Sequence, residues 1–124
     1  MRKSIWMGWG AALVLGLLAG CQNRAAIEAE VPVMIYLSAG ALQCEPGSGR
    51  NLAQDEAALA RAGITSRCAQ VADDGQMRIQ LCGSDSGRIH LFQIAAHDLA
   101  AAQGLGFQPL TQLASPPASV CAQP

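Results

Sequence analysis

Residues 88–94 read RIHLFQI, a run with apolar side chains on both of its alternations. A strand of this kind is buried on both faces, so we expect it to be a central strand of a sheet. The run VMIYL at residues 33–37 is continuously apolar and rich in β-forming residues. It predicts a second buried strand.

Two helices are expected between extended segments. Asn51 can accept a hydrogen bond from an early backbone amide and Gln54 can reach back to it, so a capping box predicts a helix start there. Gly63 fits the left-handed position after that helix. A second helix is expected over residues 96–103, with Gly106 ending it. The side chains expected to face inward are Leu52, Leu59, Ala62, Leu99 and Ala102.

Two further strands are expected beside these helices. Residues 64–71 and 77–82 flank Asp73-Asp74-Gly75-Gln76, and this pattern is typical of a hairpin. An extended segment begins at Phe107. Pro109 cannot donate to a sheet ladder, so this last strand is expected to be short and at an edge.

The order of these elements predicts an α+β fold. Each helix lies between two extended segments, as in a small ferredoxin-like, split β-α-β sandwich with an antiparallel or mixed sheet and two helices on one face. If residues 107–111 were not a strand, a minimal thioredoxin-like sheet would fit instead. The domain is expected over residues 32–113, before a Pro/Ala/Ser tail (114–124) held only by Cys121. The residues expected to be largely buried are Tyr36, Leu59, Leu91 and Phe92.

The first 21 residues, MRKSIWMGWGAALVLGLLAGC, have a different character. A positive start is followed by an uncharged run from Ile5 to Gly20, and small residues then precede Cys21. This pattern predicts a secretory signal peptide. The run is short for a bilayer span, which needs about 20 apolar residues.

Leu18-Ala19-Gly20-Cys21 resembles the lipobox of bacterial lipoproteins, and the resemblance covers residues 1–21. It implies removal of residues 1–20, a diacylglycerol on the Cys21 sulfur, and acylation of the new amine, for example by palmitate. Gln22 stands where Asp is linked to inner-membrane retention, so the periplasmic face of the outer membrane is favoured over the inner membrane. Residues 21–31 would be the lipidated N-terminus and a polar, alanine-rich tether.

The mature chain would have 104 residues, enough for one domain. Its six arginines oppose nine acidic residues, which gives a net charge of −3. No basic cluster exists, so nucleic acid is not expected as a partner. The mature aromatic residues are only Tyr36, Phe92 and Phe107, so the core must be largely aliphatic.

Four cysteines remain besides the lipidated one: Cys44, Cys68, Cys82 and Cys121. An even number in a small exported domain predicts two disulfides, and a free thiol or metal ligand is the alternative. If the predicted hairpin is centred on Gly75, Cys68 faces Cys82 across the two strands, where a disulfide can close. Cys44 would then pair with Cys121.

Several polar residues are of types that can act as catalytic or metal-binding groups. His90 and His97 could bind a metal or act as a base, but two histidines seven residues apart do not make a site. Aspartates in glycine-containing turns are favoured for local hydrogen bonding and do not fit a calcium loop. The serines lie outside any nucleophile elbow. These acidic and hydroxyl residues are Asp73, Asp74, Asp85, Ser38, Ser84 and Ser86.

Two segments suggest binding surfaces. EPGSGR at residues 45–50 leads into a helix start, which can favour an anion, but it lacks the Walker lysine and the dinucleotide pattern. It is interpreted as a loop that can contact a partner. A polar sheet face for protein recognition, or simply a solvated face, could be formed by Arg67, Gln70, Arg78, Gln80 and Arg88.

No catalytic constellation, metal site or cofactor is predicted, so the expected function is non-enzymatic. The chain is expected to be a membrane-tethered module that binds another envelope or periplasmic protein. One alternative is a small periplasmic thiol/redox or hydrolytic enzyme that uses Cys44, Cys68 or Cys82. Another is a small-ligand or metal carrier that uses His90 or Asp85.

Overall fold

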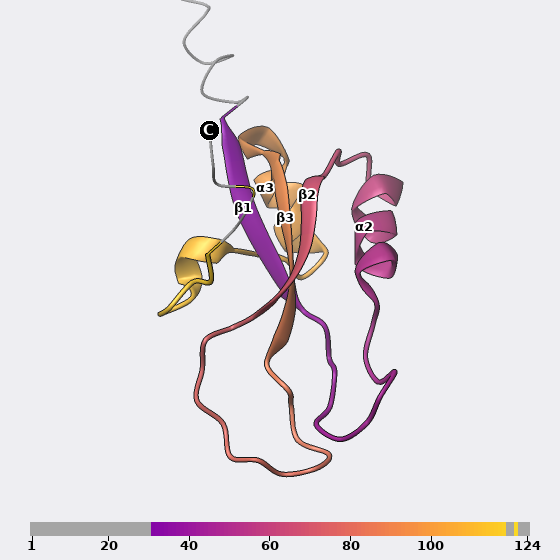
Figure 1. Ribbon diagram of the computed structural model, residues 1–124. Coiled ribbons are helices and arrows are strands. Elements are labelled where there is room, and N and C mark those ends of the chain that lie inside the picture. The colour runs from indigo at the N-terminus through magenta and orange to yellow at the C-terminus, as the bar shows by residue number, and fades with distance from the viewer. Residues whose placement is uncertain (1–30, 119–120, 122–124) are drawn as a thin grey trace, which may run out of the picture.

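A computed structural model describes residues 31–118 and Cys121. The predicted signal peptide, the lipidation site Cys21 and residues 22–30 of the tether lie outside the described residues. Figure 1 shows the order of the elements along the chain. They are β1 (Pro32–Ser38), α2 (Leu52–Arg61), β2 (Arg67–Asp73), β3 (Arg88–Ala95), α3 (Leu99–Gly104) and β4 (Gln108–Pro109), with 3-10 turns at Ala96–Asp98 and Leu110–Gln112.

The four strands form one sheet in the order β2-β3-β1-β4, and every neighbouring pair is antiparallel. β3 pairs with β1 on one side and β2 on the other, which confirms it as a central strand. One helix joins β1 to β2 and one joins β3 to β4, so the fold is the predicted α+β split β-α-β sandwich. β4 is the predicted short edge strand, and its presence removes the thioredoxin-like alternative.

Helix α2 begins and ends as its sequence predicts. The Asn51 side chain accepts from the Gln54 amide at 2.9 Å, and the Gln54 side chain accepts from the Asn51 amide at 2.8 Å, which confirms the capping box. Gly63 follows with a φ of 77°. Ala62 is exposed rather than inward-facing, because the helix ends one residue before it.

The second helical segment starts differently from the prediction. Residues 96–98 form a 3-10 turn, and α3 proper begins at Leu99. Ala102 is buried and Leu99 packs against the core, as predicted. Gly106 has a φ of 98°, which lets the chain turn back so that Phe107 enters the core.

The predicted hairpin between residues 64–71 and 77–82 is wrong. β2 pairs with β3, with Gln70 opposite Leu91 and Asp73 opposite Arg88, and residues 74–87 form a long loop. Residues 77–82 are instead held to the loop before α2 by the Gln43 side chain and by a disulfide from Cys82 to Cys44. These links keep the segment in the loop, and β2 pairs with β3.

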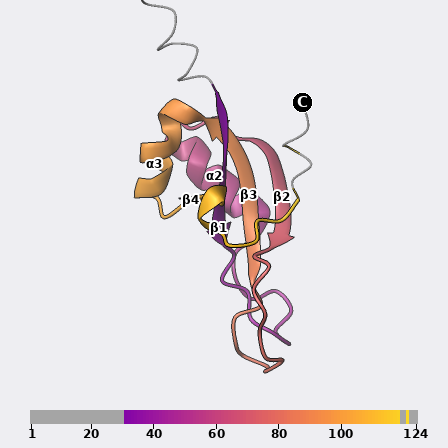
Figure 2. The same ribbon diagram turned by 90° about the vertical axis from the view of Figure 1, so that its left-hand side faces the viewer.

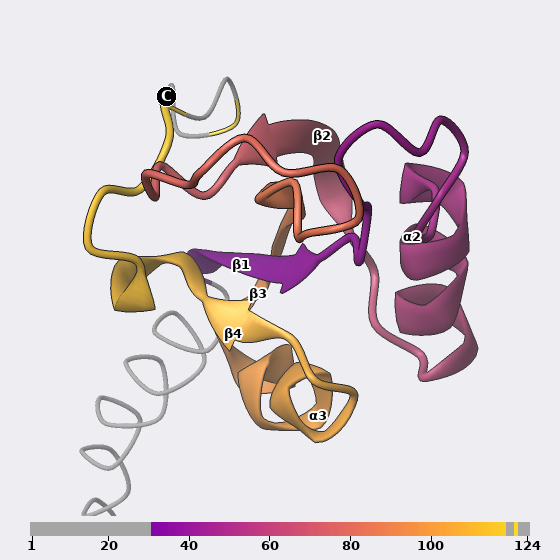
Figure 3. The same ribbon diagram turned by 90° about the horizontal axis from the view of Figure 1, so that it is seen from below.

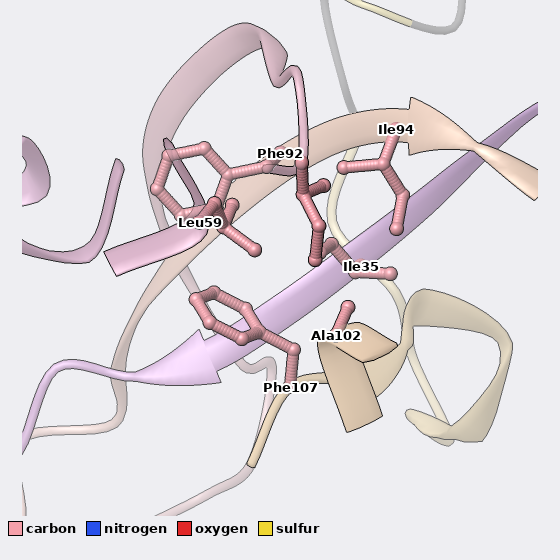
Figure 4. Packing of buried hydrophobic residues seen from close by; sticks show 7 residues of the cluster. Ile35, Leu59, Phe92, Ile94, Ala102 and Phe107 are labelled. Carbon is pink, nitrogen blue, oxygen red and sulfur yellow. The ribbon is translucent and has the colours of Figure 1, made fainter. Parts of the chain in front are cut away.

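The main core lies between the sheet and the two helices, and Figure 4 shows side chains from both layers meeting there. Phe92 and Phe107 pack edge to face, with ring centroids 5.9 Å apart and an interplanar angle of 76°. Leu59 from α2 and Ala102 from α3 complete the contact with the sheet. The buried members of this core are Ile35, Leu59, Ile64, Phe92, Ile94, Ala102 and Phe107.

The opposite face of the sheet is covered by the C-terminal segment, as Figure 3 shows. Leu110 and Leu113 pack there against Ile89 and Leu91. Tyr36 lies on this face and is less buried than the other three residues that were expected to be largely buried. Leu59, Leu91 and Phe92 are buried as predicted.

The tail after residue 113 is held by more than its cysteine. The Ser115 carbonyl lies so close to Gly75 that a Cβ there would come within 2.7 Å of it. The Gln70 side chain donates to the Ala118 carbonyl at 3.5 Å. The prediction that Cys121 alone attaches the tail is therefore wrong.

Candidate functional site

Two long loops leave the same end of the sheet and run beside each other, as Figures 1 and 2 show. One spans residues 39–50, between β1 and α2, and the other spans residues 74–87, between β2 and β3. We call these two loops together the loop lobe. A disulfide between Cys44 and Cys82 joins them, and backbone hydrogen bonds link residues 41–43 to residues 83–86.

The observed disulfides correct the predicted pairing. Cys44 pairs with Cys82, and Cys68 pairs with Cys121. All four candidate cysteines are therefore in disulfides, but not in the predicted combination. The error follows from the hairpin register, because Cys82 lies in the loop lobe and never faces Cys68 across a pair of strands.

The Gln43 side chain fastens the second loop to the first. Its amide nitrogen donates to the Ile79 and Asp85 carbonyls, each at 3.1 Å, and its oxygen accepts from the Leu81 amide at 3.0 Å. Three bonds from one side chain fix the path of residues 79–85. The role of Gln43 could not be recognised from sequence, because its partners lie far along the chain.

An ion pair holds the start of the same loop. The Arg78 guanidinium donates two hydrogen bonds of 2.6 Å to the two Asp74 oxygens and lies 3.6 Å from the Asp85 carboxylate. These bonds, and the hydrogen bond from the Gln76 amide, hold the pKa of Asp74 below its usual value despite its burial. Asp74 in turn raises the pKa of Arg78. The Arg78 side chain is thereby turned toward the protein.

The alternate side chains of this segment face solvent. Met77, Ile79 and Leu81 are 101%, 75% and 57% exposed. They are spaced two residues apart on an extended segment, so they share one side of it while Arg78 takes the other. A crosslinked and hydrogen-bonded loop thus presents three large apolar side chains to water.

The backbone of this segment also has an open edge. The Ile79 carbonyl and the Leu81 amide bond to Gln43, but the amides and carbonyls of Arg78 and Gln80 have no partner among the described residues. In an extended chain the backbone polar groups of successive residues point to opposite sides. The lobe therefore combines an apolar row with unpaired backbone groups.

His90 lies elsewhere, in the core beneath helix α2. It is 1% exposed, and its Nδ1 lies 2.7 Å from one oxygen of Asp55, which is 3% exposed. The other Asp55 oxygen accepts a 2.6 Å hydrogen bond from Arg50 Nε. Asp55 was not predicted as a site residue, although its helical spacing from Leu52 and Leu59 places it on the buried face of α2.

The remaining sequence candidates do not gather into one site. His97 is 3.4 Å from Asp98 in the 3-10 turn, away from His90. Three aspartates accept from the amide two residues on, which confirms their predicted turn role; they are Asp73, Asp74 and Asp85. The serines likewise make local hydrogen bonds; they are Ser38, Ser84 and Ser86.

The predicted polar sheet face is not formed. Gln80 lies in the loop lobe rather than on a strand, and Arg78 is engaged by Asp74. Arg67 and Arg88 lie at opposite ends of the β2–β3 pair, where they line different cavities. These residues therefore do not act as one surface.

No protein-family model matches the chain, and neither the curated proteins nor the solved structures contain a match to it. Among the described residues, no helix is both long enough and apolar enough to cross a membrane. In the same part of the chain, no three His, Cys, Asp or Glu residues are grouped so as to hold a metal ion.

Proposed function

We propose that the protein is a lipid-anchored protein of the bacterial cell envelope that acts as a non-enzymatic binding module. Its partner is another envelope or periplasmic protein, and its binding surface is the loop lobe. The observation that carries this proposal is the exposed row Met77, Ile79 and Leu81 on a loop held by a disulfide, Gln43 and an ion pair.

Exposed apolar residues in a contiguous row are a feature of protein interaction sites. A partner that covers this row gains the hydrophobic free energy of burying it. Because the loop is already held in place, little conformational entropy is lost when the partner binds. The disulfide and Gln43 link this loop to its neighbour, and the ion pair links two parts of the loop itself.

The unpaired backbone groups of Arg78 and Gln80 support a specific mode of binding. An extended segment of the partner can pair with this edge, while its side chains contact the apolar row. Backbone pairing would supply affinity, and the row Met77, Ile79 and Leu81 would supply specificity. The expected partner segment is therefore extended and apolar on one alternation.

The direction of the chain fits a tethered module. β1 begins at the end of the sheet where the tether would attach, and the loop lobe projects from the opposite end (Figure 1). Eleven residue steps from Cys21 to Pro32 reach at most about 40 Å. An anchor at Cys21 would therefore keep the domain near the membrane with its loop lobe directed away from the attachment point.

The two disulfides support an oxidising compartment such as the periplasm.

Site-specific crosslinking tests the binding surface. A photo-reactive residue at position 79 should capture a discrete envelope or periplasmic protein from intact cells, and the same residue at the exposed position 61 of α2 should not. The variant with Met77→Ser, Ile79→Ser and Leu81→Ser should lose capture through a probe placed at residue 45. Equal capture from positions 79 and 61 would place the binding surface elsewhere.

A separate experiment tests the anchor. Cys21→Ser should abolish lipidation and cleavage before residue 21, and the chain should no longer carry fatty acid by mass spectrometry. A Cys21→Ser protein that still appears as a shortened, acylated species would disprove the lipoprotein assignment. This result would leave the crosslinking test of the loop lobe unaffected.

A further inference from the structure

A cavity of about 470 Å³ opens where the loop lobe meets helix α2 and strand β3. Its walls include the glycine-containing loop of residues 47–49, the first turn of α2, and the side chains of Arg88 and His90. We propose that this cavity binds a small molecule through a phosphate or carboxylate group. This proposal does not depend on the proposed function, because the exposed apolar row lies outside the cavity.

The first group that points to a ligand is the His90 imidazole. Its Nδ1 is held by Asp55, whose second oxygen already accepts from Arg50. Because a carboxylate can only accept, Nδ1 carries the proton and Nε2 is left for another partner. Nε2 has no hydrogen-bond partner among the described residues, and no side-chain nitrogen or oxygen there is both fully buried and unpaired. Nε2 therefore keeps a small exposure, although the His90 side chain is only 2% exposed, and His90 lines this cavity.

The second group is the Arg88 side chain. It has no ion pair or hydrogen bond among the described residues. Arg88 lies two residues before His90 on β3, so both side chains project from the same face of the strand, at a spacing of about 7 Å. An anionic group with a hydroxyl beside it can contact both groups at this separation, because its charged oxygen accepts from Arg88 and the hydroxyl donates to Nε2.

The charge of the cavity favours an anion. Its wall contains Arg50 and Arg88 but no acidic side chain from the described residues. The Asp55 carboxylate lies behind His90 and Arg50, with each oxygen already bonded to one of them. The N-terminal end of the ten-residue helix α2 adds a positive dipole end.

The glycine loop shapes the opposite wall. Gly49 has a φ of 78°, and a Cβ there would lie 2.5 Å from the Ala39 carbonyl and 2.7 Å from the Ala41 amide. Only glycine lets this loop pack so closely against the end of β1. The cavity volume lies within the range of small-molecule sites, about 300–1,000 Å³, and it is larger than a single oxyanion requires. The ligand is therefore a small organic molecule that carries the anionic group.

NMR titration of the purified domain tests the site with defined probes. Inorganic phosphate, methyl phosphate and acetate are added separately at constant ionic strength, with chloride as the reference anion. Saturable shifts at the His90 ring and the Arg88 guanidinium are expected for at least one probe. The comparison of phosphate with acetate then identifies the preferred anionic group. Shifts no larger than those with chloride for every probe would overturn the proposal.

Matched variants make the test specific. Arg88→Gln should weaken probe binding about tenfold, and Arg88→Lys should retain part of it. His90→Asn keeps a donor toward Asp55 but removes Nε2, so it should weaken binding while the domain stays folded. Arg67→Gln removes the same charge from a distant cavity and should leave binding unchanged. Equal weakening by Arg67→Gln and Arg88→Gln would show only general charge attraction and would overturn the site.

Discussion

The sheet and the loop lobe contain the same residue pattern, but its apolar side chains are buried in the sheet and exposed in the lobe. On β3, Ile89 and Leu91 alternate with residues of the other face and are buried under the C-terminal segment. In the lobe, Met77, Ile79 and Leu81 alternate in the same way and are exposed. An apolar alternation therefore indicates an extended chain with one apolar side. Whether that side is buried depends on whether another layer of the protein covers it.

The two regions also differ in what holds them together. The sheet is stabilised by apolar area buried on both faces, which is a collective and non-directional effect. The lobe is stabilised by individual links: one disulfide, one glutamine side chain and one bidentate ion pair. Loss of a core residue should thus weaken the whole domain, and loss of a single link should act mainly on the lobe.

The largest effect is expected from Phe92→Ala. Phe92 is fully buried and packs against Phe107, so its truncation should lower the free energy of unfolding by about 3–5 kcal/mol. Chemical denaturation measures this change. A loss below about 1 kcal/mol would mean that the core tolerates the cavity and that the sheet is not stabilised as described.

The next largest effect is expected from removal of the disulfide in the lobe. Cys44→Ser with Cys82→Ser should lower the free energy of unfolding by about 2–4 kcal/mol, because the bond closes a loop of 38 residues. Non-reducing peptide mapping should recover Cys44 with Cys82 and Cys68 with Cys121. A peptide that joins Cys68 to Cys82 would restore the hairpin register and disprove the observed pairing.

Gln43→Ala should have a smaller and more local effect. Loss of its three hydrogen bonds should cost about 1–3 kcal/mol and should increase amide exchange in residues 79–85. Exchange in β1 and β3 should stay unchanged, since these amides bond within the sheet. Uniform acceleration across the domain would show that the lobe and the sheet unfold as one unit.

The sheet could be predicted from sequence because its signals are local. The two-faced run at 88–94, the capping box at Asn51 and the glycines after each helix each act within a few residues. The pairing of β2 could not be predicted, since alternation favours Val71 opposite the apolar Ile79, whereas the observed register sets it opposite His90. The predicted disulfide pairing depended on the hairpin register and was therefore wrong as well.

The candidate sites depend on contacts that span long stretches of chain. Gln43 reaches residues 36 to 42 positions away, and Asp55 meets His90 across 35 positions. Local patterns still held partial signals. Asp55 shares a helix face with Leu59, and His90 shares a strand face with Phe92, so the spacing of each residue indicates a buried position. Only the fold shows that they meet.

Acid should weaken the lobe before it weakens the sheet. Arg78 lowers the pKa of Asp74 from its ordinary value of 3.8, so this pair stabilises the fold fully above that pH. Its contribution is lost as the pH falls through the lower, folded-state pKa. Amide exchange in residues 76–81 should therefore increase on acidification below about pH 4. Asp74→Asn should remove most of this pH dependence, and Asp73→Asn, at an exposed turn position, should not.

The smallest effect on stability is expected where apolar residues are changed in the lobe. Met77→Ser, Ile79→Ser and Leu81→Ser together should alter the free energy of unfolding by no more than about 0.5 kcal/mol, because these side chains are exposed. Leu91→Ala, one buried residue with the same alternation, should cost about 2–5 kcal/mol. Denaturation of both variants at two protein concentrations measures the contrast directly.

A triple variant destabilised by more than about 2 kcal/mol at both concentrations would mean that the row is buried within the monomer. Destabilisation only at the higher concentration would mean that the row is covered by a second copy of the chain. We expect neither kind of destabilisation, because the three side chains are exposed and available to bind a different protein.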